Sequence, residues 1–501
     1  MIEHHFAAVL MMIGIVIIAS SLLSGAVERS GLPGVAIFLL IGIVLGPSGL
    51  GLVEFGLQSP NLQVLATLAL VLVLFTDAIG ADIGEIRRQR RLAVLILGPG
   101  TLLPAAILAV AARLLLDLPL PMAAILGAAL ASTDPVLLRT LIRHPDIPPS
   151  ARLGLRLESG MNDAILLPVV VLAMLALYGG AEAAENDVAR HVVGLFLLGP
   201  ALGALVGYVA ITLLDQVRRR VGVRRDYESL YALGVAFTAF AAAETVGGSG
   251  FLAGFAAGLV IAWLDVELCD CFLDYGEASA EMFLLLTFVA FGTGLIWTGF
   301  SVAGDWRVLL FAALALFIRT AVLLPVLARS GIDRRSRRLI ALFGPRGLSS
   351  LLLVLLPVFA GIPGAERLFV ITCLVVLLSV VVHGGGIALY LRRRARGELR
   401  PTAPAATAGP APRPARPAPV VSDTRPTAVA PAAPERITIE ELQRLRRSGE
   451  PVVVADVRTE RSYRDDPNIG AGAIRLPPDD AVRLARERRL DQHATLVLYC
   501  T

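Results

Sequence analysis

Side chains suited to binding ions are concentrated in residues 158–163, which read Glu-Ser-Gly-Met-Asn-Asp. The apolar run 164–178 follows, with the length and hydropathy typical of a membrane helix. Asp163 lies roughly 10 Å beyond Arg156 at a rise of 1.5 Å per residue. A carboxylate is costly at that depth, which favours a functional role for it.

The spacing within this stretch places two polar columns on one helical face. Glu158 and Asn162 are four residues apart, and so are Ser159 and Asp163. The column of Ser159 and Asp163 could hold an ion between a hydroxyl and a carboxylate. The column of Glu158 and Asn162 could hold the first of these columns in place through an amide. The alternative is a polar face that joins helices by hydrogen bonds. Two acids are more than such packing requires.

Two other acids lie in or near apolar spans. Ser132-Thr133-Asp134-Pro135 occupies the middle of a span, where proline should break the helix and expose helix ends suited to ion binding. Asp134 is therefore a candidate ligand; the alternative is a proline kink with a capping aspartate. Asp77, five residues before Asp82, is either a site residue or an interfacial acid.

Two arginines occur late in the apolar part of the chain. Arg319 has about ten apolar residues on each side, so it should face a carboxylate. Arg346 lies in the segment Gly344-Pro345-Arg346-Gly347, a second predicted break. Two broken helices, one in each half of a long membrane protein, indicate an inverted-repeat secondary transporter.

The whole chain is predicted to be an all-α polytopic membrane protein, because 56% of its 501 residues are hydrophobic and its mean hydropathy is +0.73. The first apolar stretch continues as a full-length span, so no separate cleavable signal peptide is expected. We expect about thirteen spans, near residues 6–24, 33–53, 61–79, 92–116, 120–142, 157–178, 191–214, 228–246, 250–264, 281–299, 306–328, 339–360 and 366–391.

The orientation follows from arginine, since the chain contains no lysine. The clusters fall after odd-numbered spans, at residues 87–91, 139–156, 218–225, 334–338 and 392–394. The positive-inside rule then predicts an outside N-terminus and a cytoplasmic C-terminus in the cell (inner or plasma) membrane.

The domain organisation changes near residue 400. Residues 1–395 form the predicted membrane domain, and the Pro/Ala-rich residues 396–435 form a disordered linker. Residues 436–501 alternate helical and β-branched segments, which indicates a small α/β unit. The four cysteines, Cys269, Cys271, Cys373 and Cys500, are too scattered for a disulfide scaffold and are expected to be free thiols.

Together these motifs resemble the monovalent cation:proton antiporters of the sodium/proton exchanger type over about residues 5–395. The resemblance implies crossed broken helices, a homodimer and exchange that serves pH homeostasis, with Asp163 binding either cation or proton. It makes Asp134, Ser159 and the Thr133 carbonyl co-ligands. It pairs Glu158 with Arg319, and Asn162 orients that pair. Asp77 stands where the family usually has a glutamate.

The chemistry of these side chains is compatible with that resemblance. Hard oxygen ligands suit Na⁺, with Li⁺ or K⁺ as alternatives, and protonation of Asp163 competes with the cation. Asn162 is neutral where some relatives carry an acid, so by resemblance one proton is exchanged per cation, without net charge. The partners expected are these ions and the bilayer, with no cofactor and no nucleic acid.

The tail resembles an incomplete rhodanese-like domain, from Asp456-Val457-Arg458 through residues 472–477 to Val497-Leu498-Tyr499-Cys500. The resemblance makes Cys500 the sulfur-carrying nucleophile. A membrane-anchored sulfurtransferase or sulfur-relay sensor is therefore an alternative function, although an anchor needs no intramembrane acids. A channel is a third, disfavoured because crossed broken helices suit alternating access.

Overall fold

The computed structural model describes most of the chain, in two compact units that divide between Pro404 and Ala405. The described residues are 10–20, 22, 34–81, 83–144, 147–178, 192–221, 225–264, 270–398, 439–447, 451–458, 469–470, 472–476, 484–485, 487–488, 490 and 494–499. The predicted linker therefore lies almost wholly outside the described residues, as do Cys269 and Cys500.

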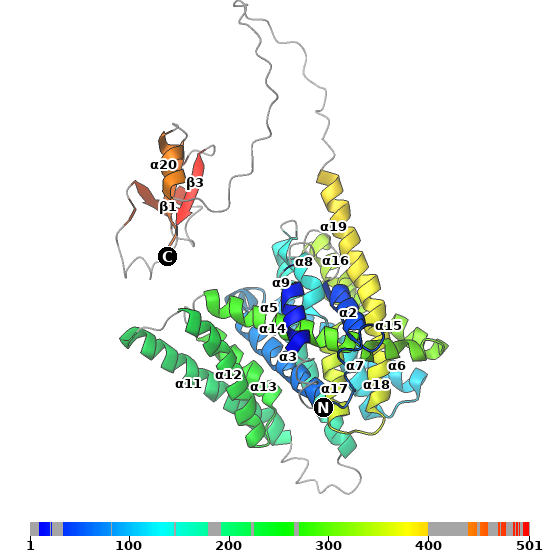
Figure 1. Cartoon of the computed structure of the whole chain (residues 1–501). Coiled ribbons are helices and arrows are strands. Elements are labelled where there is room, and N and C mark those ends of the chain that lie inside the picture. The colour runs from blue at the N-terminus through cyan, green and yellow to red at the C-terminus, as the bar shows by residue number, and fades with distance from the viewer. Residues whose placement is uncertain are drawn as a thin grey trace, which may run out of the picture. The chain divides into compact units, whose positions relative to one another are not determined.

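The first unit is a bundle of α-helices with short 3₁₀ and π-helical segments (Figure 1). Its helices are α2 (Gly34–Leu45), α3 (Pro60–Ile79), α4 (Ile83–Arg88), α5 (Arg90–Leu97), α6 (Pro99–Leu116), α7 (Leu120–Ala131), α8 (Pro135–Arg143), α9 (Pro149–Tyr178), α11 (Gly199–Arg220), α12 (Arg225–Thr245), α13 (Gly250–Trp263), α14 (Asp270–Gly292), α15 (Trp306–Leu327), α16 (Arg334–Leu342), α17 (Leu348–Phe359), α18 (Ala365–Ser379) and α19 (Gly385–Glu398). The short segments are η1 (Gly194–Leu198), η2 (Leu295–Val302) and η3 (Val380–Gly384).

Seven helical segments among the described residues are long and apolar enough to cross a membrane, or eight if the bent pair Tyr275–Gly292 and Leu295–Val302 is one span. Shorter apolar helices include Leu10–Ser20 and Gly250–Trp263. The chain is a multi-pass membrane protein, and the count of thirteen spans stays a prediction. The helix that contains the apolar span expected near residues 157–178 begins earlier, at Pro149, because Pro suits the first turn of a helix.

Both predicted helix breaks are present. The first separates α7 from α8 at residues 132–134, and Pro135 begins α8. The second separates α16 from α17 at residues 343–347. A proline cannot donate a backbone hydrogen bond and clashes with the preceding turn, which explains why a new helix starts at Pro135.

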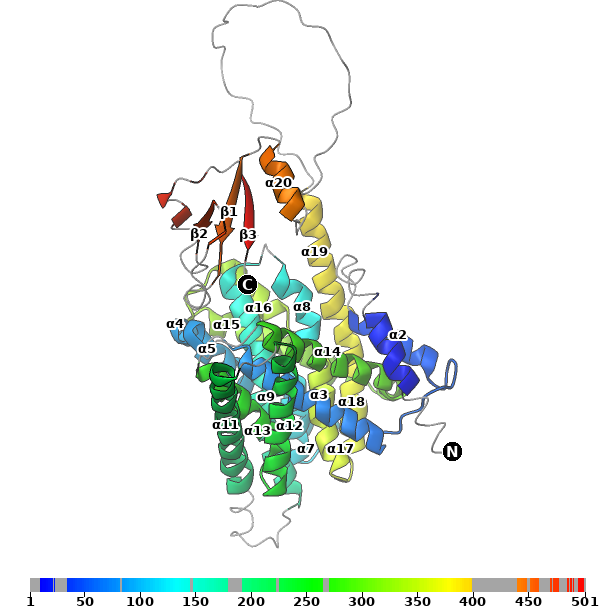
Figure 2. The ribbon, with the colours of Figure 1, turned by 60° about the vertical axis from the view of Figure 1, so that its left-hand side comes forward.

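Helices α11, α12 and α13 lie side by side, and α13 also contacts α3 (Figure 2). Glycines allow the close approach of α11 to α13. A Cβ at Gly203 would overlap the backbone of Ala253, and one at Gly207 would lie 2.7 Å from the Ala257 carbonyl oxygen. Small residues permit such packing in membranes, where van der Waals contact rather than water exclusion drives helix association.

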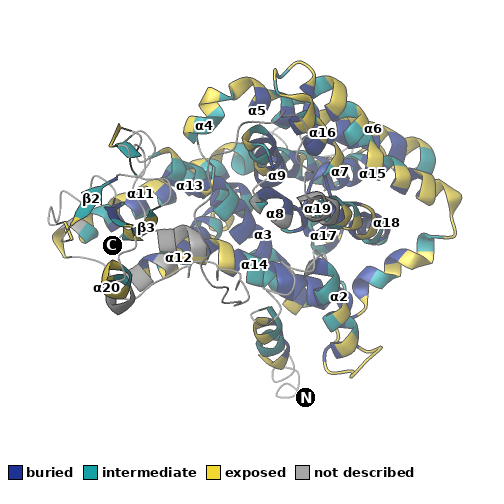
Figure 3. Ribbon diagram, turned by 90° about the horizontal axis from the view of Figure 1, so that it is seen from above, coloured by how far each residue is buried: buried dark blue, intermediate teal, exposed yellow. Residues whose placement is uncertain are grey.

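The buried core is concentrated where α3, α7, α9 and α17 meet (Figure 3). A second, smaller cluster joins α5, α8, α9, α15 and α16 through Leu92, Leu141, Leu155, Leu327 and Ile340, among others. It brings together the ends of the helices that bear the arginine clusters 87–91, 139–156 and 334–338.

The second unit contains helix α20 (Ile439–Arg447) and three parallel strands in the order β2-β1-β3. The strands are β1 (Val452–Asp456), β2 (Ala473–Arg475) and β3 (Thr495–Tyr499). Arg458 donates to both carboxylate oxygens of the buried Asp456, which holds the pKa of that carboxyl below its usual range. The rhodanese resemblance of this unit stays a prediction.

Candidate functional site

The two helix breaks meet inside the first unit. The Asp134 backbone N–H donates to the Pro345 carbonyl oxygen at 2.9 Å, so the two extended segments are hydrogen-bonded across the crossing. Four half-helices, α7, α8, α16 and α17, therefore end or begin within one buried region. Each helix end presents unpaired backbone groups and a partial charge, which the surrounding side chains must satisfy.

Asp134 accepts hydrogen bonds from backbone N–H groups at the N-terminal ends of two of these half-helices. One carboxylate oxygen accepts from the Val136 N–H of α8, and the other accepts from the Leu348 N–H of α17, both at 2.7 Å. Gly347 allows this arrangement, because a Cβ there would overlap the Asp134 carboxylate. A negative charge between two helix N-termini is favoured by both helix dipoles. Asp134 is thus a shared cap as well as a candidate ligand.

Arg346 donates hydrogen bonds to backbone carbonyls at the C-terminal end of α7, the half-helix that precedes the first break. Its guanidinium Nη1 donates to the carbonyl oxygens of Ala131 and Ser132 at 3.0 and 3.1 Å, and the side chain is fully buried. Its backbone N–H donates to the Ser379 hydroxyl at 2.7 Å. A cation at a helix C-terminus complements the negative end of the dipole. The second break therefore supplies the positive charge that the first break needs.

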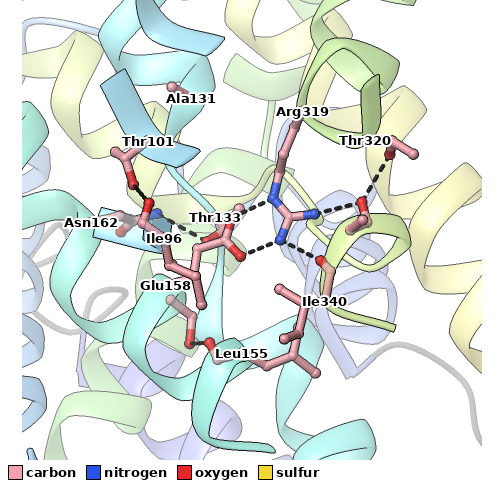
Figure 4. Close-up of polar contacts among 12 residues, drawn as sticks. Ile96, Thr101, Ala131, Thr133, Leu155, Glu158, Asn162, Arg319, Thr320 and Ile340 are labelled. Atoms are coloured by element: carbon pink, nitrogen blue, oxygen red, sulfur yellow. Dashed lines mark hydrogen bonds and ion pairs between the residues drawn. The ribbon is translucent and has the colours of Figure 1, made fainter. Parts of the chain in front are cut away.

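Arg319 has the same role for α16 (Figure 4). Its guanidinium donates to the carbonyl oxygens of Ile340 and Ala341, in the last turn of that helix, at 2.7 and 2.9 Å. On its other side it forms a two-armed ion pair with both carboxylate oxygens of Glu158. The structure thus brings Glu158 and Arg319 together, both nearly fully buried.

Asp163 lies at the same crossing but has a hydroxyl partner. The Ser132 hydroxyl donates to Asp163 Oδ1 at 2.5 Å, and both side chains are buried. Ser349, in the first turn of α17, is also buried. A hydroxyl from the first break therefore reaches the acid on α9.

The remaining predicted residues have other neighbours than expected. Ser159 donates to the Leu155 carbonyl oxygen at 2.9 Å, a bond to the preceding turn of its own helix. Asn162 donates to the Thr133 hydroxyl at 2.9 Å, which connects α9 to the first break (Figure 4). The hydroxyl that donates to Asp163 is thus that of Ser132, and the ligand role of Ser159 stays a prediction. Asn162 links α9 to Thr133, and its role in orienting the ion pair also stays a prediction.

Asp77 lies in a cleft of about 590 Å³ bordered by α3, α8, α9 and α14. A Cβ at Gly160 would lie 3.4 Å from the Asp77 side chain, so Asp77 stands against α9. The cleft reaches Ser159 and Gly160, about one helical turn before Asp163. Arg139 of α8 and Glu281 of α14 also line it and form a half-buried ion pair.

Three features of the site were not anticipated from the sequence. They are the hydroxyl of Ser132 on Asp163, the capping of α16 by Arg319, and the Arg139–Glu281 pair. The only available signal for the first was the place of Ser132 at the start of the break. Such a residue leaves the helix, and its side chain can turn to a neighbour.

Comparison with known proteins identifies the family. The family described as "Sodium/hydrogen exchanger, transmembrane" matches residues 15–393. A protein named K(+)/H(+) antiporter NhaP2 from Shewanella sp. (strain ANA-3) is 28% identical over 392 residues, which are 76% of this chain and 66% of that protein. Na(+)/H(+) antiporter 2 from Zygosaccharomyces rouxii is 25% identical over 326 residues, 55% of this chain and 38% of that protein.

The fold is also shared with a solved structure. The sodium proton antiporter MjNhaP1 from Methanocaldococcus jannaschii superposes with a TM-score of 0.61 at 17% identity, over 76% of this chain and 100% of that one. The chain spans 66% of the length of the first of these relatives. Because the family match covers most of the chain, this protein belongs to the transmembrane sodium/hydrogen exchanger family.

Proposed function

We propose that this protein is a secondary antiporter that exchanges a monovalent alkali cation for protons across the membrane. The observation that supports this most directly is the set of partners around the crossing. Glu158 is matched by Arg319, and Asp134 by two helix N-termini. Arg346 lies on the C-terminus of α7.

Asp163 differs from these charges because its hydrogen-bond partner is the neutral hydroxyl of Ser132. A buried carboxylate that is not matched by a fixed positive charge is stable when it binds a proton or a cation. Competition of the two for one carboxylate is the chemical requirement of cation/proton exchange. Asp163 is accordingly the proposed exchange site.

The proposed cation is Na⁺, with Li⁺ and K⁺ as alternatives. Carboxylate and hydroxyl oxygens surround the site, and hard oxygen ligands suit alkali cations. Two relatives are named as K⁺/H⁺ and Na⁺/H⁺ antiporters, so both ions belong in the assay.

The cleft is the proposed cytoplasmic entrance. It is lined by Arg139, Arg152 and Arg156, at the end of the bundle that carries the arginine clusters. Positive-inside orientation assigns that end to the cytoplasm, so this structure corresponds to an inward-facing state. Alternating access would then move the crossing relative to α14, to which Arg139 is tied through Glu281.

Proton flux in reconstituted vesicles tests the function. Wild-type protein is expected to move protons when Na⁺, Li⁺ or K⁺ is added, and Asp163→Asn should reduce this flux to background while inserting normally. Asp117→Asn is the matched control, because Asp117 is exposed and its left-handed backbone (φ 54°) suits asparagine. A well-inserted Asp163→Asn protein with wild-type exchange would refute the proposal.

The homodimer and the location in the cell membrane are parts of the same proposal, and they rest on the family resemblance. Chemical cross-linking in native membranes, before any detergent is added, tests the oligomeric state. Activity of residues 1–398 without the tail would separate antiport from the alternative sulfur chemistry at Cys500.

A further inference from the structure

The helices of the first unit pack into two groups (Figure 3). The site group contains α5 to α9 and α15 to α18, which contact one another and hold the crossing. The scaffold group contains α2, α3 and α11 to α14. The cleft lies between the groups, because α8 and α9 line one side of it and α3 and α14 line the other. Alternating access at Asp163 requires the two groups to move relative to each other.

An ion pair crosses this cleft. Arg139 of α8 pairs with Glu281 of α14, and both side chains line the cleft. Val136 lies on the same face of α8, one turn before Arg139, and Glu277 and Leu284 lie one turn before and after Glu281 on α14. All three also line the cleft. The pair therefore joins the facing surfaces of two helices from different groups.

α8 connects Arg139 to the exchange site. The helix begins at Pro135, directly after Asp134, so Arg139 lies five residues beyond Asp134. Asp134 caps the starts of both α8 and α17, and its backbone N–H donates to the Pro345 carbonyl oxygen. α8 is thus hydrogen-bonded into the crossing. A displacement of α8 relative to α14 moves the crossing with it.

The exposure of the pair suits a contact that forms and breaks. The side chains of Arg139 and Glu281 are 28% and 35% exposed. Ion pairs that water reaches contribute little to stability, because solvent screens the charges and both side chains lose freedom. The Glu158–Arg319 pair inside the site group is only 5% and 4% exposed, so its opening would leave buried charges unpaired. Arg139–Glu281 is therefore the pair that can open at small cost.

The sequence of α14 restricts the pair to one end of that helix. Glu277 lies one turn nearer the start of α14, and residues 282–292 contain no acid. The same face continues beyond Glu281 as Leu284 and Phe288, both buried and apolar. A movement of α8 toward Gly292 therefore takes Arg139 away from both carboxylates.

We propose that Arg139 and Glu281 form a latch that holds the site group against α14 while the cleft is open, and that this latch opens in every transport cycle. A shift of one helical turn along α14 is about 5 Å, whereas an ion pair extends to only about 4 Å. The pair cannot survive such a movement. This inference rests on the proposed function and names a contact that controls its conformational step.

Reactivity of a cleft residue tests the latch without requiring transport. Thr76 lines the cleft from α3, so Thr76→Cys in the purified protein reports how often the cleft is open to a soluble maleimide. Arg139→Glu and Glu281→Arg each place like charges across the cleft. Each should lower the labelling rate about fivefold, the effect of two like charges about 4 Å apart in water. The double reversal restores an ion pair and should restore labelling.

Arg156→Glu is the matched control for the reversals. Arg156 lines the same cleft from α9, belongs to the same group as Arg139 and is exposed. Its reversal changes the charge of the cleft by the same amount without touching the pair. The labelling rate should therefore change less than with Arg139→Glu.

A cleavable cross-link tests whether the latch opens during transport. The background replaces Cys269, Cys271 and Cys500 by serine and keeps Cys373, which is buried. The double variant Arg139→Cys, Glu281→Cys is joined by a bifunctional methanethiosulfonate, whose linker takes the place of the two long side chains. Cation-driven proton flux should fall to background on cross-linking and return with dithiothreitol.

The matched cross-link is Asp117→Cys with Arg307→Cys. That ion pair connects the end of α6 to the start of α15, both in the site group. A link within one group should leave the flux unchanged. This control separates a block of relative movement from damage caused by the reagent.

The outcomes distinguish the latch from the proposed function. Full flux through the protein cross-linked at positions 139 and 281, or Thr76→Cys labelling that neither single reversal changes, would show the latch to be wrong. Absence of flux in wild type refutes antiport, and the labelling rates then still decide the latch. If the cysteine pair does not fold, recovery of labelling by the double reversal supports the latch, and no recovery refutes it.

Discussion

The Arg346 guanidinium lies 3.0 Å from the carbonyl oxygen of Ala131, the last residue of α7. The two residues belong to different breaks, and the contact has a counterpart in Arg319, which donates to the end of α16. Each break thus depends on an arginine at the C-terminus of its first half-helix. Asp134 lies at the N-termini of both second half-helices. At the crossing, a charged side chain therefore compensates the partial charge of each of these helix ends, and the ends surround Asp163.

Replacing Arg346 tests this compensation. Arg346→Gln removes the charge and most of the donors to Ala131 and Ser132, so buried carbonyls at the end of α7 lose their partner. We expect a loss of about 3 kcal/mol of stability, within the range for hydrogen bonds to charged groups. The melting temperature in detergent measures it. Arg307→Gln, at an exposed pair with Asp117, should change little, and equal effects of the two substitutions would contradict the capping role.

The Glu158–Arg319 pair predicts a partial rescue. Either single neutral substitution leaves a buried charge unpaired, which costs roughly 3–5 kcal/mol. The double variant Glu158→Gln, Arg319→Gln removes both charges and should recover part of that loss. Full recovery is not expected, because Arg319 also serves the carbonyls of Ile340 and Ala341. Melting temperatures of the four proteins form the cycle, and additive losses would show that the pair is not coupled.

Substitution of Gly347 should impair stability and exchange although it changes no polar side chain. Gly347→Ala places a Cβ on the Asp134 carboxylate and should separate α17 from its cap, lowering both the melting temperature and cation/proton exchange. Gly385→Ala is the control, because that helical position is open and alanine favours a helix. Wild-type exchange by Gly347→Ala would mean that Asp134 does not need to cap α17.

The capping role of Asp134 also predicts the behaviour of Asp134→Asn. An amide offers one acceptor oxygen where the carboxylate offers two, so one of the N–H groups of Val136 and Leu348 loses its partner. The expected loss is about 1–3 kcal/mol. Hydrogen exchange at the starts of α8 and α17 measures it locally. Unchanged protection at both helix starts would leave only a ligand role for Asp134.

Electroneutral exchange is predicted from the single exchange carboxylate. If one proton and one monovalent cation alternate at Asp163, no net charge moves in a cycle. The rate should then be nearly independent of membrane potential, which would otherwise contribute about 2.3 kcal/mol per charge per 100 mV. Vesicles clamped with potassium and valinomycin, with Na⁺-driven pH change as the signal, provide the measurement. A steep dependence on potential would implicate a second titrating acid, Asp134 first.

Local sequence was sufficient for features that depend on local physics. Proline at position 135 and the Gly-Pro pair at 344–345 predict both breaks, because a missing N–H and a ring clash act within one helical turn. The isolated charge of Arg319 predicted a carboxylate partner, since a buried charge requires one. The family resemblance implied that this partner is Glu158, and the structure brings the two side chains together.

Only the tertiary structure decided which groups meet at the crossing. Ser132 is 31 residues from Asp163, and Leu348 is 214 residues from Asp134, so no helical spacing relates them. The spacing of Ser159 and Asp163 gave the correct face, but a serine hydroxyl within a helix can bond to its own preceding turn, as Ser159 does. Which hydroxyl faces a buried carboxylate depends on how separate helix ends pack, and that packing is a property of the whole bundle.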